Sequence, residues 1–411
     1  MNKSKNFLFI GYAIPDCVMQ EIELDDKFPA IQTHKFIWNF IKAIEYQGGI
    51  NNTYISTRPV SEYPFYPLRI IRHHESNVKI LNKIINIIEI PFINLGLLKI
   101  ITRFSSVIFY GFLKFHTRKS KDGVIVYSVH VPFMLAGYIF SKIYNIELIC
   151  LWTDPPAVPN KFDSRLKSFF RKLEFKLAKF LMRKADKVIV LTKYLAIDFA
   201  PNKPYLVIEG IIDNVDINQE MKRNKNSDKI RVVYTGSIAK RYGIKNIVDG
   251  FRLLKNKNVI LEIYGSGDFS EELVEICKSE DNILYKGFLN RREILDIQRG
   301  ADFLINARSS NEEYVKYSFP SKTLEYMCSG TPLITTMLPG IPLEYEEYIL
   351  KLDNNEPEVI MLKLEELTFM DSKERIELGE RAKKFAESKN YKYQGRKISE
   401  FLLSDFKRLK K

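Results

Sequence analysis

The sequence predicts an α/β protein of two domains, each built around a parallel sheet. Three observations carry this prediction. Short apolar runs alternate with longer segments of helical spacing, a pattern typical of parallel strands joined by helices. The alternation stops in a polar, charged stretch at 213–229 and resumes at Ile230. A chain of 411 residues also exceeds one ordinary core, which favours two domains of roughly 200 residues each.

The net charge indicates which classes of partner to expect, and the spacing of the cysteines indicates the compartment. The chain has 63 Lys and Arg against 50 Asp and Glu, so its formal net charge is +13. This balance favours an anionic partner, such as a membrane surface, a nucleic acid or a phosphorylated ligand. The sequence has no recognised nucleic-acid motif, and we expect no nucleic-acid partner. The four cysteines have neither CxxC nor zinc-site spacing, which indicates a reduced, cytoplasmic compartment and no metal site.

The first domain is expected to be a parallel sheet with helices on both faces. The strands are predicted at 7–11, 52–57, 123–128, 147–152, 187–192 and 204–209. Helices are predicted at about 34–47 and at 133–144, and the stretch 12–33 between strand and helix is predicted to be a polar loop.

The stretch 77–115 is the most hydrophobic part of the chain. Its core, 90–113, is long enough to suggest a membrane span. Helix-breaking, polar and charged residues interrupt that core, namely Pro91, Asn94, Gly96, Lys99 and Arg103. A charge near the middle of a span costs about 2.5–3.5 kcal/mol. We therefore expect two amphipathic helices, which either lie on a membrane or pack against the domain.

A strongly basic helix is predicted at 164–187. Phe and Leu residues fall on one face at helical spacing, and nine Lys or Arg residues line the remainder. Such a helix can lie in the interface of an anionic bilayer. The alternative is a helix that packs on its own domain with a solvated basic face. The combination of a Phe-rich and a Lys-rich face favours membrane contact.

Two polar residues follow strands of the first domain. His130 comes after the strand 123–128, and Asp154 comes after the strand 147–152. Because ligands of open α/β sheets bind beyond the carboxyl ends of the strands, both are candidate catalytic residues. A lone histidine is more often structural, and Asp154 precedes two prolines and can equally form a turn.

The second domain is expected to repeat the alternation of strands and helices. Its strands are predicted at 230–234, 259–264, 283–286, 302–306 and 332–336. Its helices are predicted up to residue 254, at 270–279, at 291–299 and within 319–331, with two or three charged helices over 372–411.

The loop after the first of these strands has the sequence TGSIAKRYG, residues 235–243. A glycine-containing turn between a strand and a helix can bind a diphosphate through its backbone N–H groups. Gly236 and Ser237 form the predicted turn, and Lys240 and Arg241 add two adjacent cations. The loop is neither a P-loop nor a dinucleotide-binding GxGxxG fingerprint.

A second phosphate site is predicted in FPSKTLEYMCSGT, residues 319–331. Pro320 favours the start of a helix and Gly330 its end. Free N–H groups at the helix start, around Ser321 and Lys322, coincide with the positive end of the helix dipole. Glu325, one turn further, can accept hydrogen bonds from sugar hydroxyls. The alternative is a capped amphipathic helix of any α/β domain.

These segments resemble a known family. YTGS and KRYG, LEIYGSGD, NILYKGFLNRREILDIQRGADFLINA and FPSKTLEYMCSGTPLITT are similar to the C-terminal half of the retaining nucleotide-sugar glycosyltransferases of family 4, or glycosyl transferases group 1. GVIVYSVHVP, LICLWTDPP and FLMRKADKVIVLT resemble the N-terminal half. The resemblance is specific in the C-terminal half and loose before residue 120.

The resemblance implies the GT-B fold, with two Rossmann-like domains whose parallel sheets face each other across a cleft. Residues 1–212 would form the acceptor-binding domain and 213–229 the linker. Residues 230–390 would form the nucleotide-sugar-binding domain, and a helix in 391–411 would cross back to the first domain.

The resemblance also implies roles for single residues. Glu325 matches the second acid of the family's E-x7-E motif, which holds the nucleotide ribose. The diphosphate would lie at Gly236, Ser237, Lys240 and Arg241, with Ser321, Lys322 and their N–H groups on the same phosphates. His130 and Asp154 would lie on the acceptor side, close to the reacting sugar.

Two positions depart from the family pattern. Tyr317 stands where the first acid of E-x7-E is expected, and Glu312 or Glu313 could substitute for it. Ser237 stands where the family usually has an arginine. The cation on the leaving phosphate is therefore expected to be Lys240, Arg241 or Lys322.

The function implied is transfer of a sugar from a UDP- or GDP-linked donor to a lipid-linked or saccharide acceptor of polysaccharide or glycolipid synthesis. We expect retention of configuration, no metal and no cofactor, and a peripheral location on the cytoplasmic face of the cell membrane. Two alternatives stay open. One is a nucleotide-sugar epimerase of the same fold, and the other, which Tyr317 favours, is a non-catalytic GT-B scaffold of an envelope-polysaccharide complex.

Overall fold

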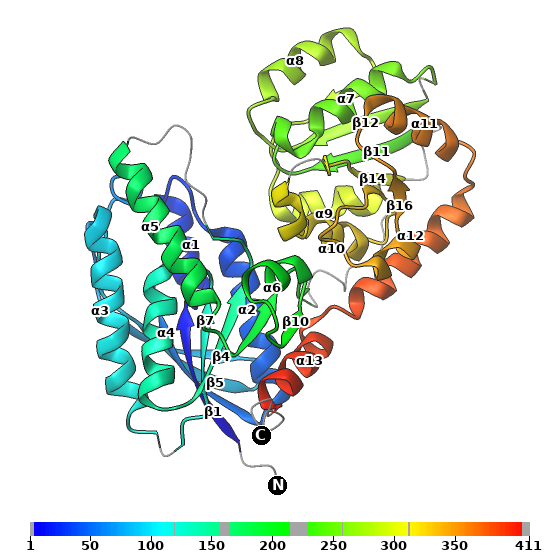
Figure 1. Ribbon diagram of the computed structural model, residues 1–411. Coiled ribbons are helices and arrows are strands. Elements are labelled where there is room, and N and C mark those ends of the chain that lie inside the picture. The colour runs from blue at the N-terminus through cyan, green and yellow to red at the C-terminus, as the bar shows by residue number, and fades with distance from the viewer. Residues whose placement is uncertain are drawn as a thin grey trace. The chain divides into compact units, whose positions relative to one another are not determined.

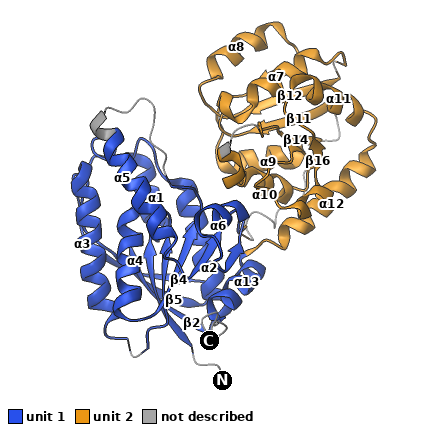
Figure 2. Ribbon diagram, viewed as in Figure 1, with its two compact units in different colours: residues 1–211, 391–411 blue, residues 212–390 orange. Residues whose placement is uncertain are grey.

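The chain folds into two compact units, which Figure 2 colours separately. The computed structural model describes residues 4–118, 120–156, 165–213, 229–256, 258–310 and 313–404. Unit 1 comprises residues 1–211 and 391–411, and unit 2 comprises residues 212–390. The predicted linker at 213–229 lies mostly outside the described residues.

Unit 1 is built on one eight-stranded sheet in the order β10-β9-β8-β7-β1-β2-β5-β4. All neighbouring strands are parallel except β4 and β5, which pair antiparallel. The strands are β1 (Lys5–Gly11), β2 (Ile50–Ser56), β4 (His74–Ile80), β5 (Lys83–Glu89), β7 (Gly123–Tyr127), β8 (Glu147–Trp152), β9 (Lys187–Val190) and β10 (Tyr205–Val207). The short strands β3 (Ile70–Ile71) and β6 (Phe92–Ile93) form a separate antiparallel pair.

Helices complete unit 1. They are α1 (Asp16–Asp25), α2 (Ile31–Gln47), α3 (Gly96–Phe115), α4 (Val131–Ile143), α5 (Arg165–Met182), α6 (Lys193–Phe199) and α13 (Tyr391–Leu403). The buried core takes aromatic and β-branched side chains from the central strands together with α2 and α13, such as Phe9, Phe40 and Ile398. The predicted α/β fold with parallel sheets in two domains is confirmed.

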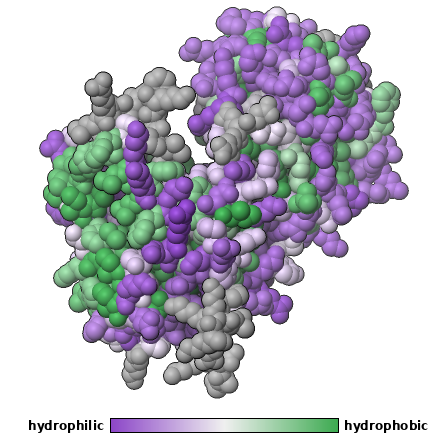
Figure 3. All heavy atoms as spheres, in the orientation of Figure 1, coloured by the Kyte–Doolittle hydropathy of each residue, from purple (hydrophilic) through white to green (hydrophobic). Residues whose placement is uncertain are grey.

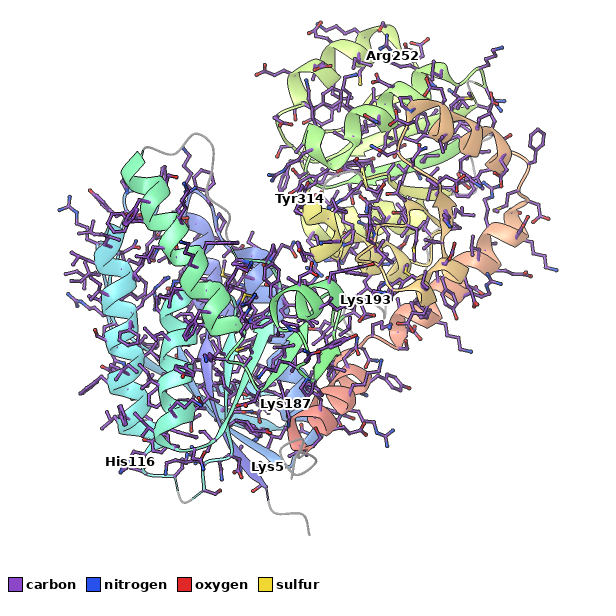
Figure 4. The ribbon with its side chains drawn as sticks, viewed as in Figure 1. Lys5, His116, Lys187, Lys193, Arg252 and Tyr314 are labelled. Carbon is purple, nitrogen blue, oxygen red and sulfur yellow. The ribbon has the colours of Figure 1, made fainter. Side chains whose placement is uncertain are left out.

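The last helix, α13, packs against α2 although the two are distant in the sequence (Figure 1). A methyl group at Gly395 would lie 2.3 Å from the carbonyl oxygen of Ala43, so only glycine permits this approach. Two lysines bind its carboxyl end, and both are labelled in Figure 4. Lys5 Nζ donates to the carbonyl of Leu403 at 2.9 Å. Lys187, which is fully buried, donates to the carbonyl of Ser404 and pairs with Glu147 at 2.9 Å.

Two predictions for unit 1 are wrong. The stretch 12–33 is not a loop, because α1 forms there and buries Val18, Met19 and Ile22 at helical spacing. Its acidic solvent face made this short apolar stripe hard to recognise. The hydrophobic stretch 77–115 holds one helix rather than two, because 74–89 forms the hairpin β4–β5. Its isoleucines are β-branched and suit a strand, and Leu81 takes a positive φ of 55° at the turn.

Unit 2 has a six-stranded sheet in the order β13-β12-β11-β14-β15-β16, with every pair parallel. The strands are β11 (Ile230–Thr235), β12 (Val259–Tyr264), β13 (Ile283–Tyr285), β14 (Phe303–Asn306), β15 (Leu333–Thr336) and β16 (Leu350–Leu352). The helices are α7 (Ile244–Leu253), α8 (Ser270–Ser279), α9 (Arg291–Gly300), α10 (Ser321–Cys328), α11 (Pro357–Leu367) and α12 (Ser372–Glu387), with 3-10 turns η2 (Lys240–Tyr242), η3 (Glu313–Tyr317) and η4 (Leu343–Tyr348).

Helices cover both faces of this second sheet. Side chains of α7, α8 and α11 pack on one face, including Phe251, Leu273 and Leu364. Side chains of α10 and α12 pack on the other, including Met327 and Ala382. This sandwich fixes the start of α10 relative to the loop that follows β11.

Each sheet has a topological switch point, where the chain leaves two adjacent strands toward opposite sides. In unit 2 this point lies between β11 and β14, because β11 leads to β12 and β14 leads to β15. In unit 1 it lies between β1 and β7, which lead to β2 and β8. Ligands of open α/β sheets bind beyond the carboxyl ends of the strands at these points.

Candidate functional site

The loop after β11 is shaped by glycines. Gly236 has a φ of +131° and Gly243 a φ of +81°, conformations that other residues rarely adopt. A methyl group at Gly243 would lie 1.9 Å from the carbonyl oxygen of Ala307, at the end of β14. The Gly236 N–H donates to the carbonyl of Tyr264 at 2.8 Å. The loop is therefore fixed by backbone contacts to two neighbouring strands.

Lys322, in the first turn of α10, lies directly over Gly236. A methyl group at Gly236 would lie 2.1 Å from Lys322 Cε and 2.6 Å from its Nζ. The Nζ atom is 3.8 Å from Glu325 Oε1 and 5.4 Å from the centre of the Tyr326 ring. Burial lowers the pKa of Lys322, Glu325 opposes this shift, and the charge of Arg308 adds to it. The structure thus brings Gly236, Lys322 and Glu325 together, as the sequence predicted.

Glu325 is held in place by a buried hydrogen-bond network. Gln298 Nε2 donates to Glu325 Oε1 at 2.8 Å and to Thr235 Oγ1 at 2.9 Å. The Tyr326 hydroxyl donates to the carbonyl of Thr235 at 2.9 Å and accepts from the Thr235 N–H at the same distance. Burial raises the pKa of Tyr326, which keeps this hydroxyl protonated. The network ties α10 to the carboxyl end of β11.

The two loop cations have partners of their own. Lys240 forms an ion pair with Glu272 of α8, and its N–H donates to Asp268 Oδ1 at 3.0 Å. Arg241 donates from Nη2 to the Tyr242 hydroxyl at 3.0 Å and stacks on that ring. Lys240 and Arg241 thus contact side chains other than those of the predicted phosphate site, whereas Lys322 lies directly over Gly236.

Arg308 is a residue that the sequence prediction missed. It follows β14 by two positions, and its Cζ lies 4.5 Å from the centre of the Tyr242 ring. Its backbone is fixed by Thr336, whose hydroxyl accepts from the Arg308 N–H at 3.1 Å and donates to its carbonyl at 2.7 Å. The rule that ligands bind beyond strand ends could have found it, because the predicted strand ended at 306.

Ser237, Ser321 and Tyr317 are the remaining positions of unit 2 that the sequence analysis singled out. The Ser237 carbonyl accepts from the Tyr234 hydroxyl at 2.7 Å. Ser321 is the first residue of α10 and is exposed. Tyr317 ends η3, and Lys316 Nζ lies 4.9 Å from its ring centre. Glu312, one proposed substitute acid, lies outside the described residues, and Glu313 begins η3.

His130 and Asp154 belong to unit 1, whereas the other candidate site residues belong to unit 2. His130 is the N-cap of α4 and packs against Phe133, with 4.4 Å between ring centres. Burial, with the charges of Arg103 and Lys99, lowers the pKa of His130 to about 3. Asp154 is exposed and accepts a hydrogen bond from Thr153 Oγ1 at 2.7 Å.

Two cations of α3 help to lower the pKa of this histidine, and their role was not predicted. Arg103 is 4% exposed, donates from Nη2 to the carbonyl of Arg58 at 2.9 Å, and lies over the Phe92 ring at 4.2 Å. Lys99 Nζ donates to the carbonyl of Val60 at 2.8 Å. Burial lowers the pKa of Lys99 to about 8. The charges that interrupt the hydrophobic stretch thus point inward and bind carbonyl groups.

Unit 1 carries a broad apolar surface over α3 and α5 on the face that Figure 3 shows. Its exposed large apolar residues are Leu97, Leu98, Ile100, Ile101, Phe109 and Leu113 on α3 and Phe169, Phe170, Leu173 and Phe180 on α5. We call this set the α3/α5 apolar surface. By length and composition α3 could also cross a membrane. Across the described residues, no group of three or more metal-ligating side chains is present.

Comparison with known proteins identifies the second unit. Residues 216–385 match the family model described as glycosyl transferases group 1. The match lies within unit 2 and covers less than half of the chain. The chain is a glycosyltransferase. No curated protein matches the sequence.

Solved structures agree on the fold of this glycosyltransferase. Anabaena HepE in complex with UDP is 14% identical, and the match covers 97% of this chain and 99% of that one with a TM-score of 0.58. The sucrose-phosphate synthase of Thermosynechococcus elongatus is 14% identical, with 98% and 99% coverage and a TM-score of 0.62. The structure of trehalose-6-phosphate from E. coli bound with UDP-2-fluoro glucose is 10% identical, with 98% and 100% coverage and a TM-score of 0.62.

Proposed function

We propose that this glycosyltransferase moves a sugar from a nucleotide-diphosphate sugar, UDP- or GDP-linked, to a lipid-linked or saccharide acceptor of polysaccharide or glycolipid synthesis. One observation carries the proposal: Lys322 lies over Gly236 and beside Glu325 at the switch point of unit 2. An ammonium group, free helix N–H groups and a glycine backbone suit a diphosphate. A fixed carboxylate one turn away suits the ribose hydroxyls.

In the proposed reaction, the bond between the sugar C1 and the diphosphate oxygen breaks, and its electron pair stays on that oxygen. The acceptor hydroxyl oxygen forms the new bond to C1, and its proton passes to the leaving diphosphate or to water. Negative charge therefore grows on the diphosphate, where Lys322 and the helix N–H groups can stabilise it. On this account the family 4 assignment, retention and independence of metal are part of the proposal.

The sequence prediction placed His130 and Asp154 near the reacting sugar, and we retain them as acceptor-side residues. Support comes from their position beyond the carboxyl ends of β7 and β8 in unit 1. Because its pKa is about 3, His130 is neutral at physiological pH. It could therefore donate or accept a hydrogen bond to a sugar hydroxyl without carrying charge.

The function can be tested by release of UDP from UDP-sugars, and of GDP from GDP-sugars, with and without a lipid-linked acceptor. We expect acceptor-dependent release by the wild type. Glu325→Ala should bind the donor much more weakly yet stay folded, because its carboxylate lies at the site edge and touches Gln298. Glu275→Ala, which removes an exposed carboxylate paired with Lys278, is the matched control. Unchanged donor binding in Glu325→Ala would show that the site is misplaced.

A second candidate function, a non-catalytic scaffold, is favoured by Tyr317 in place of the family acid. The same assay separates the two. A scaffold would bind nucleotide sugar or acceptor without any acceptor-dependent release of the nucleotide, and an epimerase would change the donor sugar without releasing it.

We further propose that unit 1 rests on the anionic cytoplasmic face of the cell membrane through the α3/α5 apolar surface. The exposed side chains Phe169, Leu173 and Phe180 favour this over packing within the domain. Cations of the same helix would bind anionic lipids. Changing Arg171, Lys172, Lys176 and Lys179 to Glu should abolish sedimentation with phosphatidylserine vesicles, and wild-type binding should weaken as salt rises. Wild-type protein that stays in the supernatant refutes this location.

A further inference from the structure

Arg308 lies at the same switch point as Lys322 but comes from a different strand. It follows β14, which pairs directly with β11. Gly243, at the end of the 235–243 loop, packs on the carbonyl oxygen of Ala307, the residue before Arg308. The guanidinium stacks on Tyr242 of the same loop. The position of Arg308 relative to the glycine loop is therefore fixed by both backbone and side-chain contacts.

The guanidinium has unused hydrogen-bonding capacity in a place where charge is costly. Its Nε atom is buried and has no hydrogen-bond partner among the described residues. No ion pair joins Arg308 to a carboxylate in the part of the chain that the structure describes. Its positive charge adds to the lowering of the Lys322 pKa that burial causes. A buried donor without a partner costs free energy, and two neighbouring cations repel each other.

Glu325 does not resolve this excess of positive charge. Glu325 faces Lys322 at 3.8 Å and accepts a shorter hydrogen bond, 2.8 Å, from Gln298. Lys240 is neutralised by Glu272. Lys322 and Arg308 therefore remain at the carboxyl ends of β11 and β14, and Arg241 stacks on the same Tyr242 ring as Arg308. An anion with two charged groups would satisfy both.

We propose that Arg308 is the second cation of the donor-diphosphate site and binds the leaving phosphate together with Lys322. It would do so through Nε and Nη, whose fork fits two phosphate oxygens. This inference rests on the proposed function and assigns to Arg308 the task that the resemblance gave to the position of Ser237. When the bond from C1 to the diphosphate oxygen breaks, the electron pair remains on an oxygen that Arg308 and Lys322 share.

Binding of inorganic pyrophosphate and of UDP to the full chain, measured by calorimetry, tests the inference. Arg308→Gln removes the charge and keeps much of the volume, and we expect both ligands to bind about ten- to a hundredfold more weakly, as for charge-assisted hydrogen bonds. Arg308→Lys should fall between this variant and the wild type, because it keeps the charge and loses the fork. Arg252→Gln, an exposed arginine at the end of α7 (Figure 4), should bind as the wild type does.

The outcomes separate this inference from the proposed function. If Arg308→Gln binds pyrophosphate normally while Lys322→Gln does not, Arg308 is not in the site and the proposed function stands. If Arg241→Gln loses binding instead, the loop cation performs the task and the inference is wrong. If the wild type binds neither pyrophosphate nor UDP nor GDP, the donor site itself is refuted. Thermal unfolding midpoints of all variants should agree within a few degrees. If Arg308→Gln does not fold, the binding of pyrophosphate and UDP by Arg308→Lys tests the inference in its place.

Discussion

The switch points of the two units are filled in opposite ways. In unit 2, the Gly236 backbone forms the turn at the end of β11, and the Lys322 side chain lies over it. In unit 1, the rings of Tyr12, His130 and Phe133 pack against one another, with 5.1 Å between the centres of Tyr12 and Phe133. Arg103 of α3 lies over the Tyr12 ring at 5.7 Å. The unit 2 switch point thus consists of the Gly236 turn with Lys322 over it, which we call the cradle. The unit 1 switch point consists of packed aromatic rings, which we call the aromatic wall, with the neutral His130 among them.

This difference indicates which part of the substrates each switch point can bind. A diphosphate needs close approach to N–H groups and cations, which the unit 2 switch point offers. Sugar rings and hydroxyls suit apolar faces with a few polar groups, which the unit 1 switch point offers. The comparison therefore supports donor binding in unit 2 and acceptor binding in unit 1.

The largest expected effect comes from filling the cradle with one methyl group. Gly236→Ala would place a Cβ 2.1 Å from Lys322 Cε and displace the cation, so donor turnover should fall by about a hundredfold, similar to loss of an oxyanion-type contact. Gly287→Ala is the matched control, because Gly287 also has a positive φ, +74°, and nothing lies within 4 Å of the added carbon. Gly287→Ala should lose about 1 kcal/mol of stability from backbone strain, and Gly236→Ala more, because its φ of +131° lies farther from the left-handed region that other residues adopt.

Equal turnover in the two glycine variants would show that Lys322 does not act through its position over Gly236. The assay is sugar transfer at saturating acceptor, with stability measured by denaturant unfolding. The difference between the two variants, rather than either value alone, reports on the cradle.

Much of this cradle could be predicted from sequence because its parts are local. The turn at Gly236 and the helix start at Lys322 each lie within one short motif, and both were placed correctly. Arg308 was missed because it belongs to no such motif and gains its importance only from the pairing of β11 with β14. Local patterns cannot show which strand ends become neighbours.

The sequence was less informative for unit 1. His130 was found by its place after a strand, but the wall around it includes Arg103 of α3, whose surrounding stretch suggested a membrane or packing helix. Helix α1 was missed because only Val18, Met19 and Ile22 are buried in an otherwise polar segment. The hairpin β4–β5 was missed because a short run of isoleucines has no clear helical or strand period.

The second expected effect is a pH dependence of donor binding in unit 2. Burial lowers the pKa of Lys322, and only the charged form attracts a diphosphate. Affinity for UDP should therefore fall as pH rises through this lowered pKa, below the value of about 10.4 for an ordinary lysine. In Lys322→Arg, whose guanidinium stays charged, the fall should vanish between pH 7 and 10. An unchanged pH profile in Lys322→Arg would contradict the assignment.

The smallest expected effect is a pH dependence of stability in unit 1. The pKa of His130 is about 3 in the folded chain and about 6.5 when unfolded, so the unfolded state binds the extra proton between these values. The stabilisation from neutral His130 is present above pH 6.5 and is lost as pH falls, by up to about 1.4 kcal/mol per unit. In His130→Gln this component of the slope between pH 6.5 and 5 should disappear. Denaturant unfolding at several pH values measures it, with exposed His74→Gln as control.

If His130→Gln and His74→Gln show the same slope, then His130 is not a buried neutral group and the contrast between the two switch points weakens. A smaller slope in His130→Gln alone would sharpen that contrast, because it would show that His130 is kept neutral in the folded chain.

The most direct test of the account is a crystal structure of the chain with the nucleoside diphosphate that stabilises it most against thermal unfolding. The central claim is that Lys322 and the Gly236 turn hold the diphosphate at the unit 2 switch point. We predict diphosphate oxygens within about 3.2 Å of Lys322 Nζ and ribose hydroxyls at hydrogen-bond distance from Glu325. A nucleotide bound elsewhere, or a diphosphate held by Lys240 and Arg241 with Lys322 uninvolved, would contradict the claim.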